Sequence, residues 1–213
     1  MTLRPVYRSL LQRMATSISV DDLLAKPRKL PLPKPKAFVD GACLDQANKL
    51  KRVAGSGVYL GPDHPLNVSE PVEGAQTNQR AELKAMIRGM QQSRAAGYDE
   101  VEIFSDSTYA IGEVERFFYM GDTPSTKTYS AKKPNLDLLD QLAEEMCVWD
   151  HNKLLVTKIE AHAGHHGNEM ADQLAKKAAL AAQVAKKKRE EDESPGHDPD
   201  ATAAPTKKKH MKK

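Results

Sequence analysis

Two aspartates are associated with predicted strands: one lies within a strand, and the other directly follows one. Asp40 stands inside the alternating apolar segment 37–43 and precedes a glycine. A carboxylate in a half-buried strand is costly unless something binds it. Asp106 directly follows the apolar segment 101–105, and ligands of open α/β sheets gather beyond the carboxyl ends of strands. Asp40 and Asp106 are therefore candidates for one shared site.

Two further acids lie near the starts of predicted helices. Glu82 flanks an apolar stripe in TNQRAEL, and Asp172 lies in GNEMADQL. Taken singly, each acid has an ordinary explanation. Acids in the first turn of a helix are stabilised by the helix dipole, Asp106 could be a helix cap, and Asp40 could face water at a strand end. The set becomes informative only when the sequence contexts are read together.

Hydrophobic periodicity predicts the elements that would position these acids. Leu83, Met86, Ile87 and Met90, for example, recur at i, i+3, i+4 and i+7, as on one face of a helix. An antiparallel meander followed by alternating helices and strands predicts an α/β fold, a sheet covered by helices. The predicted strands are 37–43, 53–60, 66–70, 101–105 and 154–159, the helices are 77–95, 107–118, 136–149 and 168–183, and 119–134 is a loop.

Charge is distributed unevenly along the 213 residues. Residues 1–36 carry eight Lys/Arg and two Asp/Glu, residues 184–213 carry nine and six, and the central 37–183 carry 15 and 21. An acidic core is a poor surface for nucleic acid unless cations sit in it, whereas basic ends attract phosphates. The length and the 39% apolar residues predict one domain, 37–183, with two extensions.

The two ends differ from the core in composition. Residues 1–20 hold three arginines, no acid and one apolar helical face, which is typical of a mitochondrial transit peptide, with a disordered basic terminus as the alternative. The Pro/Lys-rich composition of residues 26–36 predicts a linker. The composition of residues 184–213 predicts a disordered tail. The tail's Lys clusters indicate nuclear import, phosphate binding or a purely solubilising role. Mitochondrion and nucleus are thus both predicted locations.

Other classes of protein are disfavoured by the composition. No run approaches 18 apolar residues, so no membrane span is predicted. Cys43 and Cys147 lack CxxC spacing, and the chain shows no secretory signal. We expect both to be reduced thiols in an intracellular protein.

The contexts of the acids resemble the type 1 ribonuclease H family. VDG, TNQRAEL, FSDS and HAGHHGNEMADQLA occur in the family's order at compatible spacings, and GSGVYLGPDHPLNV resembles its eukaryotic members. The resemblance covers 37–183 and implies a mixed five-stranded sheet flanked by helices. It also implies endonucleolytic hydrolysis of the RNA strand of RNA–DNA hybrids. Residues 1–36 are expected to be too short and too Pro-rich to form the N-terminal hybrid-binding module of many eukaryotic members.

By the same resemblance, Asp40, Glu82, Asp106 and Asp172 would bind two Mg²⁺ ions, with Mn²⁺ as a substitute and Asp40 as the bridging ligand. Clustered carboxylates repel one another and otherwise take up protons, and hard oxygen ligands suit Mg²⁺. Two such ions can clamp an in-line displacement at phosphorus. The implied products carry 5′-phosphate and 3′-hydroxyl ends.

The run of three histidines before the last acid also matches the family. His162 would transfer protons or assist product release, because imidazole titrates near neutrality. His165 and His166 compete for this role. Zinc binding by the His-x-x-His-His run is an alternative, although no cysteine lies nearby.

The resemblance further implies residues that contact the hybrid. Asn78 and Gln79 would contact the minor groove of the RNA strand, with Cys43 on the same side, and Thr77 and Asn135 would hold a DNA phosphate. Asn78 could equally cap a helix.

Two departures from the family weaken the expected grip on the substrate. Ala75 stands where many members have Arg, and segment 116–134 lacks the Trp of a basic protrusion. The remaining alternatives are a binding module that kept the fold without catalysis and another nuclease of this fold. We expect a monomer whose partner is the hybrid, without membrane contact.

Overall fold

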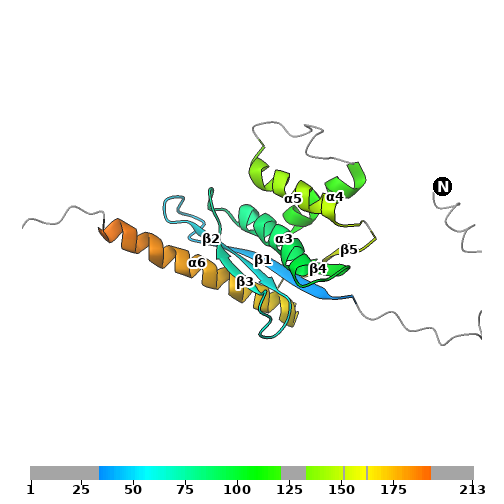
Figure 1. Ribbon diagram of the computed structural model, residues 1–213. Helices are drawn as coiled ribbons and strands as arrows, with labels where there is room; N and C mark the ends of the chain where they lie inside the picture. The colour runs from blue at the N-terminus through cyan, green and yellow to red at the C-terminus, as the bar shows by residue number, and fades with distance from the viewer. Residues whose placement is uncertain (1–33, 121–132, 151, 162, 193–213) are drawn as a thin grey trace, which may run out of the picture. The chain divides into compact units, whose positions relative to one another are not determined.

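The computed structural model describes residues 34–120, 133–150, 152–161 and 163–192 (Figure 1). Five strands form one sheet in the order β3-β2-β1-β4-β5. The pairs β1–β2 and β2–β3 are antiparallel, whereas β1–β4 and β4–β5 are parallel. This confirms the predicted mixed five-stranded α/β fold. The elements are β1 (Lys36–Leu44), β2 (Val53–Tyr59), β3 (Val68–Pro71), α3 (Asn78–Ala95), β4 (Val101–Ser105), α4 (Thr108–Met120), α5 (Leu136–Val148), β5 (Leu154–Lys158) and α6 (His166–Asp192).

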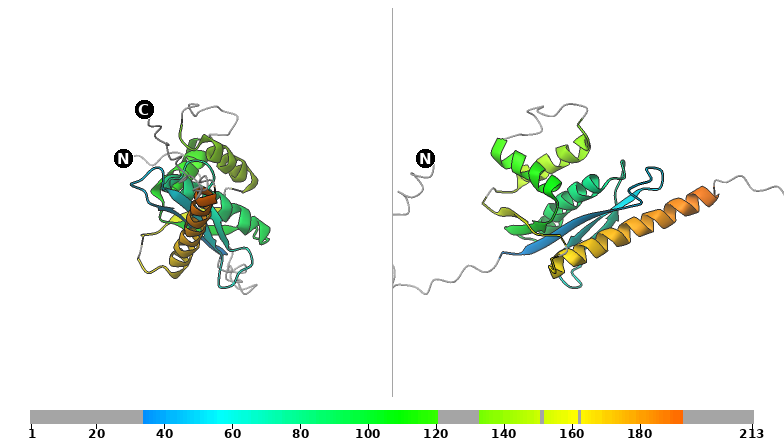
Figure 2. Two further views of the ribbon diagram at one scale, coloured as in Figure 1. Left: turned by 90° about the vertical axis from the view of Figure 1, so that its left-hand side faces the viewer. Right: turned by 180° about the vertical axis from the view of Figure 1, so that it is seen from behind.

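Helices cover both faces of the sheet. α6 packs along β1 and β2 on one face, while α3 packs on β1 from the other face, with α4 and α5 against α3 (Figure 2). Small residues allow α6 to come very close. A Cβ on Gly57 of β2 has no room, because the backbone of Ala171 and Ala175 lies against it. This close approach fixes the start of α6 beside the middle of the sheet.

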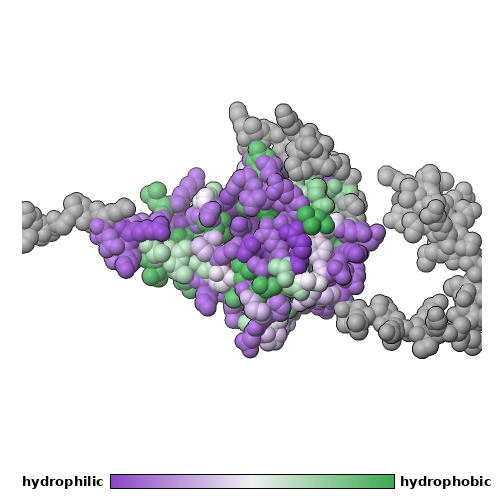
Figure 3. Space-filling model, viewed as in Figure 1, coloured by the Kyte–Doolittle hydropathy of each residue, from purple (hydrophilic) through white to green (hydrophobic). Residues whose placement is uncertain are grey.

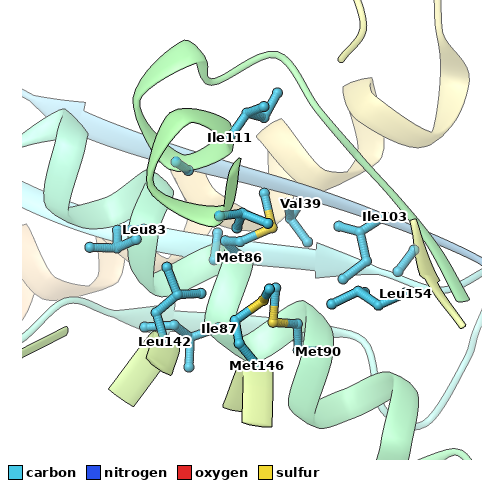
Figure 4. Close-up of a cluster of buried hydrophobic side chains, with 14 of the residues drawn as sticks. Val39, Leu83, Met86, Ile87, Met90, Ile103, Ile111, Leu142, Met146 and Leu154 are labelled. Atoms are coloured by element: carbon cyan, nitrogen blue, oxygen red, sulfur yellow. The ribbon is translucent and has the colours of Figure 1, made fainter. Parts of the chain in front are cut away.

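The main hydrophobic core lies between the sheet and α3, α4 and α5. Val39 and Ile103 from the sheet meet Met86 and Met90 of α3 and Leu142 of α5 (Figure 4), and all five are fully buried. The predicted stripe on α3 is confirmed. Each such side chain contributes about 1.5–3 kcal/mol when removed from water, so this core holds α3 firmly on β1.

The prediction of where the last helix ends was wrong. α6 continues to Asp192, nine residues beyond the predicted end at 183. Residues 184–192 consist mostly of Ala, Lys, Arg and Glu, which favour helix, and Lys187 pairs with Glu191 at i, i+4. The Lys-rich composition predicted disorder, but the helical propensity of the same residues, together with contacts to the β1–β2 loop, extends the helix.

Several expectations lie outside the described residues. They include the transit-like segment, most of the linker 26–36, residues 193–213 of the tail, and most of segment 116–134. Among the described helices, none has the length and apolar character required to cross a membrane.

Candidate functional site

The four predicted acids line one pocket of about 430 Å³. They come from four separate elements, since Asp40 lies on β1, Glu82 on α3, Asp106 just after β4 and Asp172 on α6. Up to 132 sequence positions separate the acids, and the structure brings all four together.

Strand register explains why the two aspartates of the sheet are neighbours. Phe38 of β1 pairs in parallel with Phe104 of β4, and their rings stack with centroids 4.9 Å apart. Asp40 lies two residues after Phe38 within β1, and Asp106 lies two residues after Phe104, just past the end of β4. The parallel pairing therefore places both carboxylates beside the carboxyl end of β4, where ligands of open α/β sheets gather.

The pocket strongly disfavours an extra negative charge. Burial raises the pKa of Asp40 to about 7, with further upward contributions from the charges of Asp106, Asp172 and Glu82. The backbone N–H of Gly41, 2.7 Å from Oδ1, opposes this rise. Burial also raises the pKa of Glu82. A site that raises the pKa of its acids favours a proton or a metal cation near them.

Polar side chains hold two of these carboxylates, Glu82 and Asp106, in place. Glu82 accepts hydrogen bonds from Asn78 Nδ2 at 2.6 Å and from Ser107 Oγ at 2.7 Å. Asp106 accepts one from Asn168 Nδ2 at 3.2 Å. The roles of Ser107 and Asn168 were not predicted from the sequence, although Ser107 adjoins Asp106 in FSDS and Asn168 precedes Asp172 by one helical turn.

Asp172 has a cationic partner on its own helix. Lys176 Nζ lies 2.7 Å from Asp172 Oδ2, and the two side chains are 52% and 23% exposed. This ion pair was not predicted from the sequence either. The i, i+4 spacing is a signal that could have revealed it. Lys176 thus supplies one positive charge at the edge of an acidic pocket.

The donor set suits a hard divalent cation such as Mg²⁺, which prefers carboxylate oxygens. The amide oxygen of Asn168 is buried without a hydrogen-bond partner, and it belongs to the side chain that contacts Asp106. Within the described part of the chain, no three His, Cys, Asp or Glu side chains converge into a ready-made metal cage. The carboxylates instead keep the partners described above, so a cation would displace Lys176 or share the site with it.

The predicted histidines do not share one environment. His166 opens α6 and packs edge-on against Tyr59, with ring centroids 6.1 Å apart, whereas His165 lines a small hollow with Asp172 and Asn168. His162 lies outside the described residues, although Ala161 beside it lines the acidic pocket.

A second hollow of about 200 Å³ adjoins the acidic pocket. It brings together Cys43, Thr77, Asn78 and Gln79, four of the five predicted hybrid-contact residues. Cys43 and Asn78 line both hollows. Asn78 is not the helix cap that the sequence left open, because Thr77 caps α3 by accepting from the backbone N–H of residue 80. Gln46 and Arg52 also line this hollow, and neither was predicted from the sequence.

Asn135, the fifth predicted contact, lies before α5 in the left-handed region with φ 61°. Its amide donates to Tyr109 Oη at 3.2 Å and accepts from Arg80 at 3.5 Å. The backbone N–H of Arg80 also donates to the Thr77 hydroxyl. One arginine therefore links the two residues predicted to hold a phosphate.

The sheet order and the acid-lined pocket define an α/β domain whose site is suited to cations. The family model for RNase H matches residues 34–180, and the chain belongs to this family. The resemblance to type 1 ribonuclease H is thereby confirmed.

Several curated relatives are similar in sequence. Ribonuclease H1 of Mus musculus is 35% identical over 147 residues, which is 67% of this chain and 49% of that protein. Ribonuclease H of Schizosaccharomyces pombe is 34% identical over 144 residues, covering 67% and 52%, and that of Pseudomonas fluorescens is 35% identical, covering 65% and 87%. The chain thus spans about half the length of the eukaryotic relatives it matches.

Solved structures agree on the fold. A type 1 RNase H with the type 2 active-site motif, LC9-RNase H1, superposes with a TM-score of 0.51 at 25% identity, over 71% of this chain and 75% of that one. The PFV RNase H domain gives 0.53 at 18% identity, over 68% and 94%.

Proposed function

We propose that this chain hydrolyses the RNA strand of RNA–DNA hybrids endonucleolytically. The observation that carries the proposal is the gathering of four acids from four elements in one pocket of an RNase H family member. The names of its relatives support the reaction class. The partner would be the hybrid, bound by a monomer.

Asp40, Glu82, Asp106 and Asp172 would hold two Mg²⁺ ions, or Mn²⁺ as a substitute. The chemistry that such a pair supplies is activation of the attacking water and stabilisation of the leaving 3′ oxygen, with 5′-phosphate and 3′-hydroxyl products. Asp40 is central because its pKa depends on all three other acids. Ser107 and Asn168 position Glu82 and Asp106 through the hydrogen bonds described above.

The residues that line the second hollow would contact the sugars of the RNA strand. Recognition of RNA against DNA requires contact with the 2′-hydroxyl. Asn78 and Gln79 present amides there beside Cys43, while Thr77 and Asn135 would contact a phosphate of the DNA strand. Asn78 would couple the two tasks, because its amide also holds Glu82.

The test is cleavage of a hybrid, double-stranded RNA and double-stranded DNA, each with and without Mg²⁺. We expect Mg²⁺-dependent cleavage of the hybrid alone, and a loss of about a thousandfold in Asp106→Asn, since about 4 kcal/mol of transition-state stabilisation is a typical charge effect. Asp140→Asn, an exposed acid of α5 outside the pocket, is the matched control.

Two outcomes would favour the alternatives. Hybrid binding without cleavage would indicate a non-catalytic binding module, and equal cleavage of double-stranded DNA would indicate a different nuclease. Full activity of Asp106→Asn would contradict the proposed site.

We assign proton transfer or product release to His162. His162→Ala should slow turnover while leaving Mg²⁺ affinity, measured by calorimetry, within error of the wild type. His165→Ala is the control because His165 lines a neighbouring hollow. A larger effect in the control than in His162→Ala would transfer the role to His165.

Mitochondrial and nuclear locations both remain proposals drawn from the composition of the two ends. Imaging of tagged chains that lack residues 1–36 or 184–213 distinguishes them. The mitochondrial proposal fails if removing 1–36 leaves the distribution unchanged.

A further inference from the structure

Helix α6 continues past the family domain. The RNase H match ends at residue 180, whereas α6 continues to Asp192. Figure 1 shows this end of the helix projecting beyond the sheet, and Figure 3 shows strongly hydrophilic residues there, at the left of the view. The extension contains the four consecutive basic residues 186–189.

Contacts from the loop between β1 and β2 hold the extension of α6. The loop 45–52 between β1 and β2 lies against it, where Gln183 Nε2 donates to Asp45 Oδ2 at 2.7 Å and Lys186 Nζ donates to the Leu50 carbonyl. A hollow of about 320 Å³ lies between loop and helix. The position of the extension relative to the acidic pocket is therefore set by side-chain contacts.

Helical geometry places one lysine on the same side as the acidic pocket. Lys176 lines that pocket, and Lys187 follows eleven residues later, so it lies only about 20° further around the helix at 3.6 residues per turn. Lys187 lines the hollow beside loop 45–52. Lys188 lies about 120° around from Lys176 and is not part of that lining. At about 1.5 Å per residue, Lys187 is about 22 Å along the axis from Asp172.

Basic side chains of two elements meet at this hollow. Lys51 of the loop, Lys186 and Lys187 line it, together with the acids Asp45 and Glu190. Lys187 is 3.9 Å from Glu191, but these side chains are 78% and 66% exposed. An exposed pair of this kind contributes little, so Lys187 can exchange Glu191 for another anion. Arg52, at the end of the same loop, lines the hollow next to the acidic pocket.

We propose that Lys51, Lys186 and Lys187 form a basic arm that binds the phosphate backbone of the substrate duplex outside the acidic pocket. The proposal rests on the proposed function, because it needs a duplex seated at the acids. At about 3.4 Å per base pair, 22 Å corresponds to about six or seven pairs. The basic arm would supply positive charge to a chain that has Ala75 where many family members have Arg and that lacks Trp in segment 116–134.

The experiment uses the full chain and duplexes with one cleavable RNA segment at a fixed place. Each duplex continues beyond the cleavable segment on one side only, and both sides are tested in turn. This added duplex, called the duplex arm, has about three or about twelve base pairs, which span less or more than the 22 Å distance. Lys187→Ala is compared with Lys188→Ala, a matched exposed lysine on the same helical turn. The readouts are KM in Mg²⁺ and Kd by fluorescence anisotropy in EDTA over a series of salt concentrations.

We expect Lys187→Ala to raise KM and Kd about fivefold more for one long-arm duplex than for the short-arm duplexes. This is the factor expected for one lost phosphate contact near 0.15 M salt, with a salt slope smaller by about one. Lys188→Ala should show no dependence on arm length.

Equal effects of the two substitutions, or an effect of Lys187→Ala that ignores arm length, would overturn the basic arm and leave only general electrostatic attraction. Failure of the proposed function is distinguishable, because it would abolish cleavage of every duplex by the wild type. The EDTA binding series would still show whether the affinity depends on arm length and on Lys187.

Discussion

Gly41 of β1 lies directly against the backbone of Glu82 on α3, with no room for a side chain between them. The residue before this glycine is Asp40, so the contact sets how closely two of the four acids approach. The main core holds α3 on β1 from the same side. The packing of one helix on one strand is therefore part of the site geometry.

Gly41→Ala should disrupt both stability and the site. A Cβ at this position would force α3 away from β1, at a cost of about 1–3 kcal/mol for overpacking, and would separate Asp40 from Glu82. Urea unfolding and Mg²⁺ calorimetry measure the two effects. Gly112→Ala is the control, because nothing lies within 4 Å of the new methyl group and alanine favours the helix by about 1 kcal/mol. Wild-type Mg²⁺ affinity in Gly41→Ala would contradict the role of this contact.

Asp40→Asn should stabilise the metal-free protein while abolishing activity. The pKa of Asp40 is raised to about 7 by burial and by the other acids, so its carboxylate form disfavours folding. This penalty is absent below the ordinary pKa of about 4, grows as the pH rises towards 7, and is complete above that. A rise of this size corresponds to at most about 4 kcal/mol.

Thermal unfolding in EDTA at pH 4 and pH 8 measures this penalty. The gain in Tm of Asp40→Asn over the wild type should be large at pH 8 and small at pH 4. Asp140→Asn, outside the pocket, should show no such pH dependence. A mutant no more stable than the wild type at pH 8 would show that Asp40 carries no such penalty.

Arg80→Met should destabilise the protein by about 2–3 kcal/mol, because it removes charge-assisted hydrogen bonds from a nearly buried side chain. Arg80 Nε donates to the Glu73 carbonyl at 2.6 Å, and the guanidinium pairs with Asp137. Arg94→Met is the control. Its side chain is 44% exposed, against 10% for Arg80, so the expected loss is below about 1 kcal/mol.

The effect of Arg80→Met should also depend on pH. The hydrogen bond from Arg80 lowers the pKa of Asp137, so the pair stabilises the fold above the ordinary pKa of Asp137. That contribution is lost as the pH falls through the lowered value. Urea unfolding should therefore show a smaller difference from the wild type in acid, and a constant difference would assign the loss to packing alone.

Lys176→Met should raise the affinity for Mg²⁺. Lys176 is paired with Asp172 at the edge of the acidic pocket, and a cation must compete with it. An exposed pair of this kind is worth about 0.2–1 kcal/mol, which corresponds to a gain of up to about fivefold. Lys177→Met, an exposed lysine outside the pocket lining, should change the affinity less. Weaker Mg²⁺ binding in Lys176→Met would mean that the lysine supports the site.

Local sequence patterns predicted the strands and α3, whereas the four acids were singled out only by the resemblance of their sequence contexts to the family. Periodicity depends on neighbouring residues, and the buried stripe on α3 appeared as expected. The prediction from composition was wrong at residues 184–192, where clustered charge predicted disorder but the chain is helical. The helix there is favoured by residues of high helical propensity and by contacts with loop 45–52, which lies more than 130 positions earlier in the chain.

By itself, the sequence determined the elements that carry the four acids, because hydrophobic periodicity is local, and the family motifs around the acids indicated that they could act together. Only the tertiary structure decided what surrounds each acid: Ser107 on Glu82, Asn168 on Asp106, and the loop that supports the end of α6. These contacts join residues far apart in the chain. They depend on sheet order and on how closely helices approach glycine positions, which no short stretch of sequence specifies.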